Sequence, residues 1–331
     1  MANNILFIGG TGIISSAVSP LVVARGDNLF VLNRGISPRG QPAGARLVQA
    51  DIRTDPGALA KAIAQHKIDV VVDWIAFVPE QVQGDIDACL GRVKQYVFIS
   101  SASAYQKPIR KLPITEETPL ENPFWEYSRN KAKCEQLLME AYRKQGFPVT
   151  IVRPSHTYDK TLFPFHGGYT VVDRMRKGKP VIVHGDGTSL WVMTHHQDFA
   201  VGFTGLLGNP AAVGEIFHIT SDELLTWNAI FGMIAEAAGA ELHAIHVPSE
   251  LIAKYDADWG ASLLGDKAHS VIFDNSKIKR VVPEFNPRIP FAEGVREVMA
   301  WVDGNPAAQL VDEKANALYD KIIIDFGSLG K

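Results

Sequence analysis

Cysteine is scarce in this sequence. Cys89 and Cys134 are the two cysteines among 331 residues. A single pair provides neither a disulfide framework nor a cluster of thiolates for a structural zinc ion. Two free thiols are typical of a reducing compartment, so we expect a cytoplasmic protein.

Long hydrophobic runs are also missing. No apolar stretch reaches the roughly 18 residues that a transmembrane helix requires. The first apolar segment, residues 5–8, follows the start of the chain almost at once, with no basic segment before it. We therefore expect neither a membrane span nor a signal peptide.

Neither sign of charge is in excess. The chain has 33 Lys and Arg against 36 Asp and Glu, a net charge of −3. This balance provides no bulk attraction to nucleic acids or to anionic membranes. The ten histidines show no metal-ligand spacing on an apolar helix, so no metal site is expected.

Short apolar runs alternate with longer mixed segments in the first half. Buried strands are predicted over residues 5–8, 29–32, 47–49, 70–73, 96–99 and 149–152. Helices fit between them, for example over 15–24 and 55–65. This alternation predicts an α/β fold of the Rossmann type, a doubly wound parallel sheet covered on both faces.

The rhythm breaks after Pro154, where glycine, proline and aromatic residues become frequent. Helices are predicted over 168–177, 197–207, 226–239 and 290–303, with strands over 215–220 and 242–247. We expect a dinucleotide-binding domain over residues 1–160, to which segments near 195–235 return. Residues 161–331 are then mainly a smaller α/β substrate-binding region.

A glycine turn follows the first strand and opens a helix. Its pattern is Gly9-x-x-Gly12-x-x-Ser15, with serine where a third glycine is usual. Glycine lets the backbone approach a pyrophosphate, and the helix N-terminus presents N–H groups and positive dipole charge. The expected cofactor contacts here are Gly9, Thr11, Gly12, Ile13 and Ile14.

The end of the second strand is expected to contact the adenosine ribose. Asn33 and Arg34 stand there, with no acid. Because a guanidinium binds phosphate in bidentate fashion, Arg34 favours NADP over NAD, although an exposed loop arginine is the alternative. Asp51 and Ile52 follow the third strand and are placed beside the adenine, while a helix N-cap remains open for Asp51.

Tyr127 and Lys131 are spaced i and i+4, which puts both on one face of a helix. A nearby ammonium favours a phenolate and lowers the pKa of a tyrosine. A serine-rich segment that includes Ser101 and Ser103 follows the strand at 96–99. Ligands of open α/β sheets bind at the carboxyl ends of strands, where a serine can donate to a substrate oxygen.

These motifs resemble the extended short-chain dehydrogenases/reductases, called NAD-dependent epimerases/dehydratases. The matching segments span roughly residues 5–200: 9–12, 98–105, Tyr127 with Lys131, Arg153-Pro154, 185–187 and 195–198. The sequence is also similar to a subgroup related to chloroplast stem-loop RNA-binding proteins.

The resemblance implies that Ser101 polarises a substrate oxygen and that Tyr127 is the general acid/base. It implies that Lys131 holds the nicotinamide ribose and lowers the Tyr127 pKa. Residues near the cofactor would include Trp74, Ala76, Pro154 and His156.

Ser103, Trp125 and Trp191 are expected on the substrate side, with core packing as the alternative for the aromatic residues. Trp191 stands where nucleotide-sugar members commonly carry an arginine that grips the diphosphate. An indole has one donor and no charge, which counts against a nucleotide-sugar substrate.

Two functions are in competition. The first is NAD(P)-dependent hydride transfer on a polar, sugar-like hydroxy or keto compound, as an oxidoreductase or an epimerase/dehydratase. The second is an RNA-binding protein that keeps the dinucleotide fold, which the net charge of −3 disfavours. A homodimer is compatible with the family resemblance.

Overall fold

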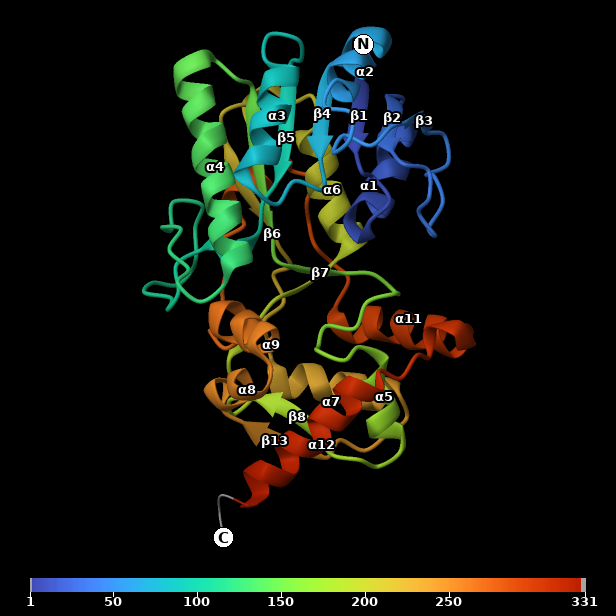
Figure 1. The fold of residues 1–331 in the computed structure, drawn as a ribbon, viewed down its shortest axis with the longest axis vertical. Coiled ribbons are helices and arrows are strands. Elements are labelled where there is room, and N and C mark those ends of the chain that lie inside the picture. The colour runs from blue at the N-terminus through green and yellow to red at the C-terminus, as the bar shows by residue number, and fades with distance from the viewer. Residues whose placement is uncertain (1, 329–331) are drawn as a thin grey trace.

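A computed structural model describes residues 2–328. Its first lobe is built on a seven-stranded parallel sheet (Figure 1). In spatial order the strands are β3 (Arg46–Gln49), β2 (Asn28–Asn33), β1 (Asn4–Ile8), β4 (Val70–Asp73), β5 (Gln95–Ile99), β6 (Val149–Pro154) and β11 (Ile216–Ile219). The strand order reverses between β1 and β4, where doubly wound sheets bind their ligands.

Five helices cover the two faces of this sheet. One face carries α1 (Ile13–Ala24) and α6 (His196–Leu206), and the other carries α2 (Ala58–His66), α3 (Pro79–Cys89) and α4 (Glu126–Gln145). Side chains alternate along each strand. Ile5 and Phe7 therefore join the α1 and α6 core, while Leu6 and Ile8 join the α2, α3 and α4 core.

The second lobe holds a separate hydrophobic cluster below the sheet. Its small paired sheets are β7 (His156–Tyr158) with β10 (Met193–His195), β9 (Leu190–Trp191) with β12 (Leu225–Thr226), and β8 (Val181–His184) with β13 (Ala244–Val247). Its helices are α5 (Tyr169–Arg176), α7 (Trp227–Ala237), α8 (Ser249–Tyr255), α9 (Ala257–Ser262), α11 (Phe291–Asp303) and α12 (Glu313–Ser328). Between α9 and α11 the chain returns to the first lobe through α10 (Ser276–Val281), which packs on α6 and β11.

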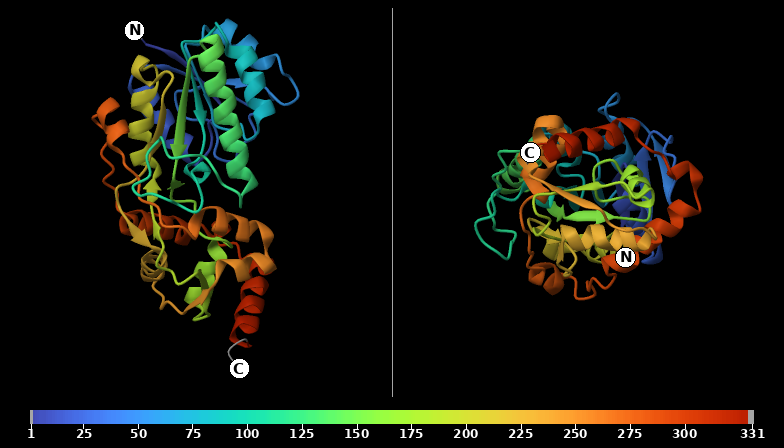
Figure 2. Two further views of the ribbon diagram at one scale, coloured as in Figure 1. Left: turned by 90° about the vertical axis from the view of Figure 1, so that its left-hand side faces the viewer. Right: turned by 90° about the horizontal axis from the view of Figure 1, so that it is seen from below.

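The fold class predicted from the sequence is confirmed: an α/β sheet of the Rossmann type with a smaller C-terminal α/β region. The residue limits of the two domains stay a prediction. The last helix predicted from the sequence, over 290–303, is not the last in the structure. It is followed by α12, which packs on α5, α8 and β8. In Figure 2 this helix lies at the end of the second lobe farthest from the sheet.

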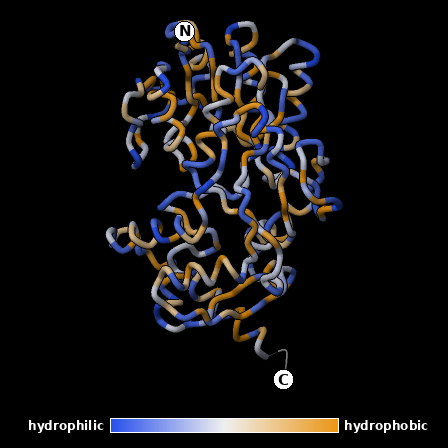
Figure 3. Tube along the Cα trace, turned by 180° about the vertical axis from the view of Figure 1, so that it is seen from behind, coloured by the Kyte–Doolittle hydropathy of each residue, from blue (hydrophilic) through white to orange (hydrophobic). Residues whose placement is uncertain are grey.

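Hydrophobic stretches of the trace lie inside both lobes, and the outer loops are largely hydrophilic (Figure 3). Within residues 2–328, no helix combines the length and apolar character needed to cross a bilayer. The carboxyl ends of β1 and β4 point toward the second lobe. Loops from both lobes therefore meet at this edge of the sheet.

Candidate active site

The turn after β1 requires glycine at two positions. Gly9 and Gly10 have positive φ angles of 91° and 81°, which side chains rarely adopt. A Cβ on Gly9 would lie 2.8 Å from Ile75 Cγ2, and one on Gly10 would lie 3.1 Å from Phe7 Cβ. The turn therefore has no side chain at either position, and the Gly9 backbone borders the groove described in the next paragraph.

A groove of about 430 Å³ runs along the carboxyl ends of β1, β2 and β3. It is lined by six residues that the sequence assigns to the cofactor: Gly9, Thr11, Asn33, Arg34, Asp51 and Ile52. Asn33 also holds the glycine turn, because its Nδ2 donates to the Gly9 carbonyl at 3.1 Å. Arg53, which sequence reasoning missed, lines the same groove.

Several other expected cofactor residues do not line this groove. Gly12 is the N-cap of α1, which begins at Ile13 and continues through Ile14. Ser15, in place of a third glycine, is buried, and its Oγ accepts a hydrogen bond of 2.8 Å from the Gly12 N–H. The serine thus stabilises the first turn of the helix.

Trp74 and Ala76 lie near the groove but not in its wall. The Trp74 ring packs against Phe7 and Phe203 on the α1 and α6 side of the sheet, with centroid distances of 5.3 and 4.9 Å. Ile75 and Phe77 line the groove instead. The Ala76 carbonyl accepts a hydrogen bond from Lys131.

A second cavity, which we call the inner cavity, has a volume of about 280 Å³ and lies where the two lobes meet. Every residue that the sequence assigns to catalysis or to substrate, except Lys131, lines it: Ser101, Ser103, Trp125, Tyr127 and Trp191. Pro154 and His156 line it as well. Phe77 stands between the groove and the inner cavity, 6.2 Å from the Tyr127 ring.

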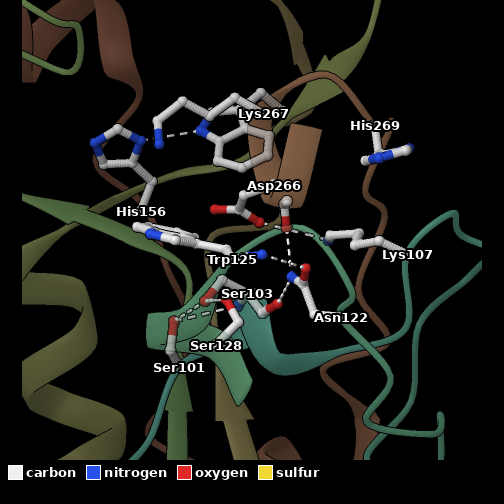
Figure 4. Close-up of polar contacts among 12 residues, drawn as sticks. Ser101, Ser103, Lys107, Asn122, Trp125, Ser128, His156, Asp266, Lys267 and His269 are labelled. Carbon is white, nitrogen blue, oxygen red and sulfur yellow. Dashed lines mark hydrogen bonds and ion pairs between the residues drawn. The ribbon is translucent and has the colours of Figure 1, made fainter. Parts of the chain in front are cut away.

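Three serine hydroxyls form a chain at one wall of the inner cavity (Figure 4). Ser128 Oγ donates to Ser103 Oγ at 2.8 Å, and Ser103 Oγ lies 2.9 Å from Ser101 Oγ. Burial raises the pKa of Tyr127, and a hydrogen bond with Ser101 partly opposes that effect. The phenol is therefore protonated at neutral pH in this state and lies in contact with Ser101.

Lys131 lies beneath this wall. Its Nζ donates to the carbonyl oxygens of Ala76 and Ile99, each at 2.7 Å. Burial lowers the Lys131 pKa to about 8. The Nζ is 5.8 Å from the centroid of the Tyr127 ring, so the ammonium faces the ring and does not bond the hydroxyl.

His156 and Trp191 are joined across the inner cavity. The Trp191 indole Nε1–H donates to His156 Nδ1 at 3.1 Å, so the neutral imidazole carries its hydrogen on Nε2. Burial, reinforced by the Lys267 ammonium, lowers the His156 pKa to about 3. The pair therefore contributes no charge at neutral pH.

Sequence reasoning missed Asp266 and Lys267, which also line the inner cavity. They come from η3 (Leu263–Lys267), far along the chain from every recognised motif. Across residues 2–328, no group of three or more His, Cys, Asp or Glu residues is arranged to hold a metal ion.

Comparisons with known proteins identify the family to which the chain belongs. The model of the NAD dependent epimerase/dehydratase family matches residues 5–220. The 2'-dehydrokanamycin reductase of Streptomyces kanamyceticus is 27% identical over 304 residues, covering 90% of this chain and 84% of that protein. The chloroplast stem-loop binding protein of 41 kDa b of Arabidopsis thaliana is 28% identical over 253 residues, covering 71% of this chain and 63% of that protein.

Among solved structures, the UDP-glucuronic acid 4-epimerase of Bacillus cereus in complex with UDP-glucuronic acid and NAD has a similar fold. The TM-score is 0.73 at 18% identity, covering 91% of this chain and 99% of that one. The family match extends from the strand before the glycine turn to the end of the seventh strand of the sheet. This chain belongs to the NAD dependent epimerase/dehydratase family, within the extended short-chain dehydrogenases/reductases.

Proposed function

We propose that the protein is an NAD(P)-dependent oxidoreductase that acts on a polar hydroxy or keto compound in the inner cavity. The observation that carries this proposal is the joint position of Ser101 and Tyr127. Both line the inner cavity, where the Ser101 hydroxyl lies close enough to the Tyr127 phenol to influence its pKa. A substrate oxygen that contacts both hydroxyls would lie in the cavity beside the end of the groove.

The groove fits a dinucleotide. Gly9 lines the groove and has no side chain, so a pyrophosphate can approach the backbone of the turn. The start of α1 adds N–H groups and dipole charge for the phosphates. When bound, the nicotinamide supplies hydride transfer.

The proton chemistry is assigned to the protein's own side chains. In the reduction, the protonated Tyr127 hydroxyl donates its proton to the substrate oxygen and becomes a phenolate. In the reverse oxidation, the phenolate form of Tyr127 accepts the hydroxyl proton. Ser101 donates a hydrogen bond to the same substrate oxygen, and the chain through Ser103 and Ser128 keeps its hydroxyl oriented. Lys131 is assigned to the ribose, for which its Nζ would exchange one backbone carbonyl for a sugar hydroxyl.

NADP is the proposed cofactor in preference to NAD. Arg34 and Arg53 both line the groove, and Asn33 occupies the end of β2 where an acid would favour NAD. Guanidinium groups bind phosphate in bidentate fashion, which suits a 2′-phosphate. The solved neighbour with NAD shares the fold, and its cofactor does not determine the preference of this chain.

The reaction type depends on whether the keto product leaves. Release makes the enzyme a dehydrogenase or reductase, and retention permits epimerisation or dehydration. The relative named as a reductase covers most of this chain, which supports release. We therefore propose reduction of a sugar-like ketone, or the reverse oxidation.

Turnover by the wild type and by Tyr127→Phe tests the proposal. The assay follows the absorbance of the reduced nicotinamide with a panel of sugar-like ketones and alcohols. We expect the variant to lose about 10²–10⁴-fold in kcat and to keep its affinity for NADP. Equal rates in the two proteins would refute the role of Tyr127.

RNA binding is the second candidate, and the name of the Arabidopsis relative is what favours it. A basic side of α4, formed by Arg129, Lys133 and Arg143, lines a cleft of about 810 Å³. Glu121 and Glu135 share that cleft, which weakens its attraction for phosphates. Retention of a stem-loop RNA at physiological salt, lost in Arg129→Gln/Lys133→Gln, would support this function in place of catalysis.

A further inference from the structure

The wall of the inner cavity opposite the serines is formed by η3, a single π-helical turn. Such turns are rare and are frequently found at functional sites. Asp266 and Lys267, at the end of this turn, face the inner cavity (Figure 4). None of the reaction steps assigned above uses either side chain.

The backbone of the turn is held firmly. The Lys267 carbonyl oxygen lies 3.1 Å from His184 Nε2 and accepts hydrogen bonds from Ser189 Oγ at 3.2 Å and Trp227 Nε1 at 3.1 Å. These contacts involve the main chain of Lys267 alone. Its side chain is therefore placed by a backbone that does not depend on it.

The same turn is tied to the catalytic serine segment. Asn122 Nδ2 donates to the Gly265 carbonyl at 2.6 Å and to the Ser103 carbonyl at 2.7 Å. A Cβ on Gly265 would lie 2.6 Å from Trp125 Cβ, so glycine permits this close approach. The position of Lys267 relative to Ser101 and Tyr127 is consequently fixed on both sides.

The Lys267 ammonium lies against an aromatic ring instead of an acid. Its Nζ is 5.5 Å from the centroid of the Trp125 ring, which is itself 5.0 Å from the Tyr127 ring. Across residues 2–328, no hydrogen bond or ion pair joins this Nζ to an oxygen atom. Burial lowers the Lys267 pKa, the Lys107 ammonium adds to that effect, and the adjacent Asp266 carboxylate opposes it.

The neighbouring acid has another partner. Asp266 Oδ1 lies 3.4 Å from Lys107 Nζ, and the Lys107 side chain is fully buried behind it. His156 is neutral, and the other cavity side chains are hydroxylic, aromatic or aliphatic. Asp266, Lys107 and Lys267 together give this wall of the inner cavity a net charge of one positive unit.

We propose that Lys267 binds the single carboxylate of a small polyhydroxylated substrate, whose ring packs on Trp125 with its reacting carbon beside Ser101 and Tyr127. This substrate class rests on the proposed function and makes it more specific. A nucleotide diphosphate does not fit, because one ammonium and a neutral His156–Trp191 pair cannot balance two phosphate charges. Lys267 is accordingly the residue that selects a sugar acid over a neutral sugar.

Binding of a matched pair of probes tests this selection. Methyl glucuronide and methyl glucoside share one ring and differ in a carboxylate against a hydroxymethyl group. Each is titrated by calorimetry into the protein saturated with NADP, together with UDP as a further probe. We expect the glucuronide to bind at least about tenfold more tightly than the glucoside, or about 1.4 kcal/mol.

Lys267→Met is expected to remove this preference and to change the glucoside affinity by less than about twofold. Lys254→Met, which changes an exposed lysine of α8, is the matched control and should bind as the wild type does. A preference that survives Lys267→Met overturns the proposal. It is equally overturned if the glucuronide does not bind or if UDP binds more tightly than the glucuronide.

Tyr127→Phe separates this inference from the proposed function. The variant should keep the preference for the sugar acid, because Lys267 and Trp125 are unchanged. A protein that selects the sugar acid but turns over equally well with Tyr127→Phe would refute the assigned catalysis and leave the binding site intact. Melting curves of Lys267→Met beside the wild type confirm that the variant is folded.

Discussion

His184 and Lys267 are joined by a hydrogen bond of 3.1 Å between the imidazole Nε2 and the Lys267 carbonyl oxygen. A carbonyl can only accept, so Nε2 carries the hydrogen. Burial lowers the His184 pKa to about 4, and the imidazole is therefore uncharged at neutral pH. A neutral histidine in the second lobe thus holds the turn that forms one wall of the inner cavity.

This arrangement predicts a loss of stability in mild acid. The unfolded chain binds the His184 proton with a pKa near 6.5, and the folded chain binds it with a pKa of about 4. The unfolded state therefore takes up more protons as the pH falls below about 6.5, and stability falls with it until the folded pKa is reached. Between pH 7 and pH 5 the contribution is about 2 kcal/mol.

Urea denaturation at the two pH values measures this effect with His184→Gln. The variant should lose about 2 kcal/mol less than the wild type on acidification, because glutamine does not titrate. His243→Gln, at an exposed histidine, is the control and should follow the wild type. Parallel losses in all three proteins would show that His184 does not titrate in this range.

Gly9→Ala tests the groove. Its methyl group would lie 2.8 Å from Ile75 Cγ2 and would push the Ile75 side chain, which lines the groove, out of its position. We expect the dissociation constant for NADP, measured by fluorescence titration, to rise by more than about tenfold. Gly26→Ala is the control, because Gly26 has a similar φ of 88° but no atom near its missing side chain. If both variants lose affinity equally, backbone strain and not the approach of the phosphate is responsible.

Arg34→Gln tests the preference for NADP. The Arg34 side chain lines the groove beside Asn33 and is exposed, so its removal does not disturb the core. Loss of a charge-assisted contact to a 2′-phosphate should raise KM for NADP about tenfold and leave KM for NAD nearly unchanged. Steady-state kinetics with both cofactors give the ratio. If the ratio of the two KM values is the same in Arg34→Gln as in the wild type, Arg34 does not bind the 2′-phosphate. That contact then belongs to Arg53, or the enzyme does not prefer NADP.

The strands of the seven-stranded sheet, the glycine turn and the inner-cavity residues Ser101 and Ser103 could be predicted from the sequence because their signals are local, whereas the short strands β7, β8, β9, β10 and β12 were not predicted. Tyr127 and Lys131 are one helical turn apart, and Ser101 directly follows a strand whose carboxyl end defines the site. The helix α12 was missed, although Ala315, Tyr319 and Ile322 are buried at helical spacing. That spacing could have predicted it.

Lys267 and Asp266 could not be predicted in the same way. They reach the inner cavity through tertiary contacts such as the hydrogen bond from Asn122 to Gly265, which joins residues 143 positions apart. Lys131 also depends on tertiary context, because two backbone carbonyls bind its Nζ. The sequence also does not show which residue after β4 points toward the groove. In the structure Ile75 lines the groove, and Trp74 packs on the opposite side of the sheet.

Arg39 connects the loop after β2 to the second lobe, and we expect this contact to slow the release of the cofactor from the groove. Its guanidinium lies 2.6 Å from Asp159 Oδ2, and the Asp159 side chain is only 4% exposed. Ile36, Ser37 and Pro38 of the same loop line the groove. Because Arg39→Met leaves a buried carboxylate unpaired, the loop should detach and NADP should dissociate several-fold faster.

Stopped-flow displacement of NADP measures that rate. Lys61→Met is the matched control, since the Lys61–Asp55 pair is exposed and lies outside the groove wall, with a separation of 3.5 Å. Its dissociation rate should equal that of the wild type, because exposed pairs contribute little. The association rate should change less than the dissociation rate in Arg39→Met, because changes within one binding site act mainly on dissociation. If both rates are unchanged, the loop closes the groove without help from the Arg39–Asp159 ion pair.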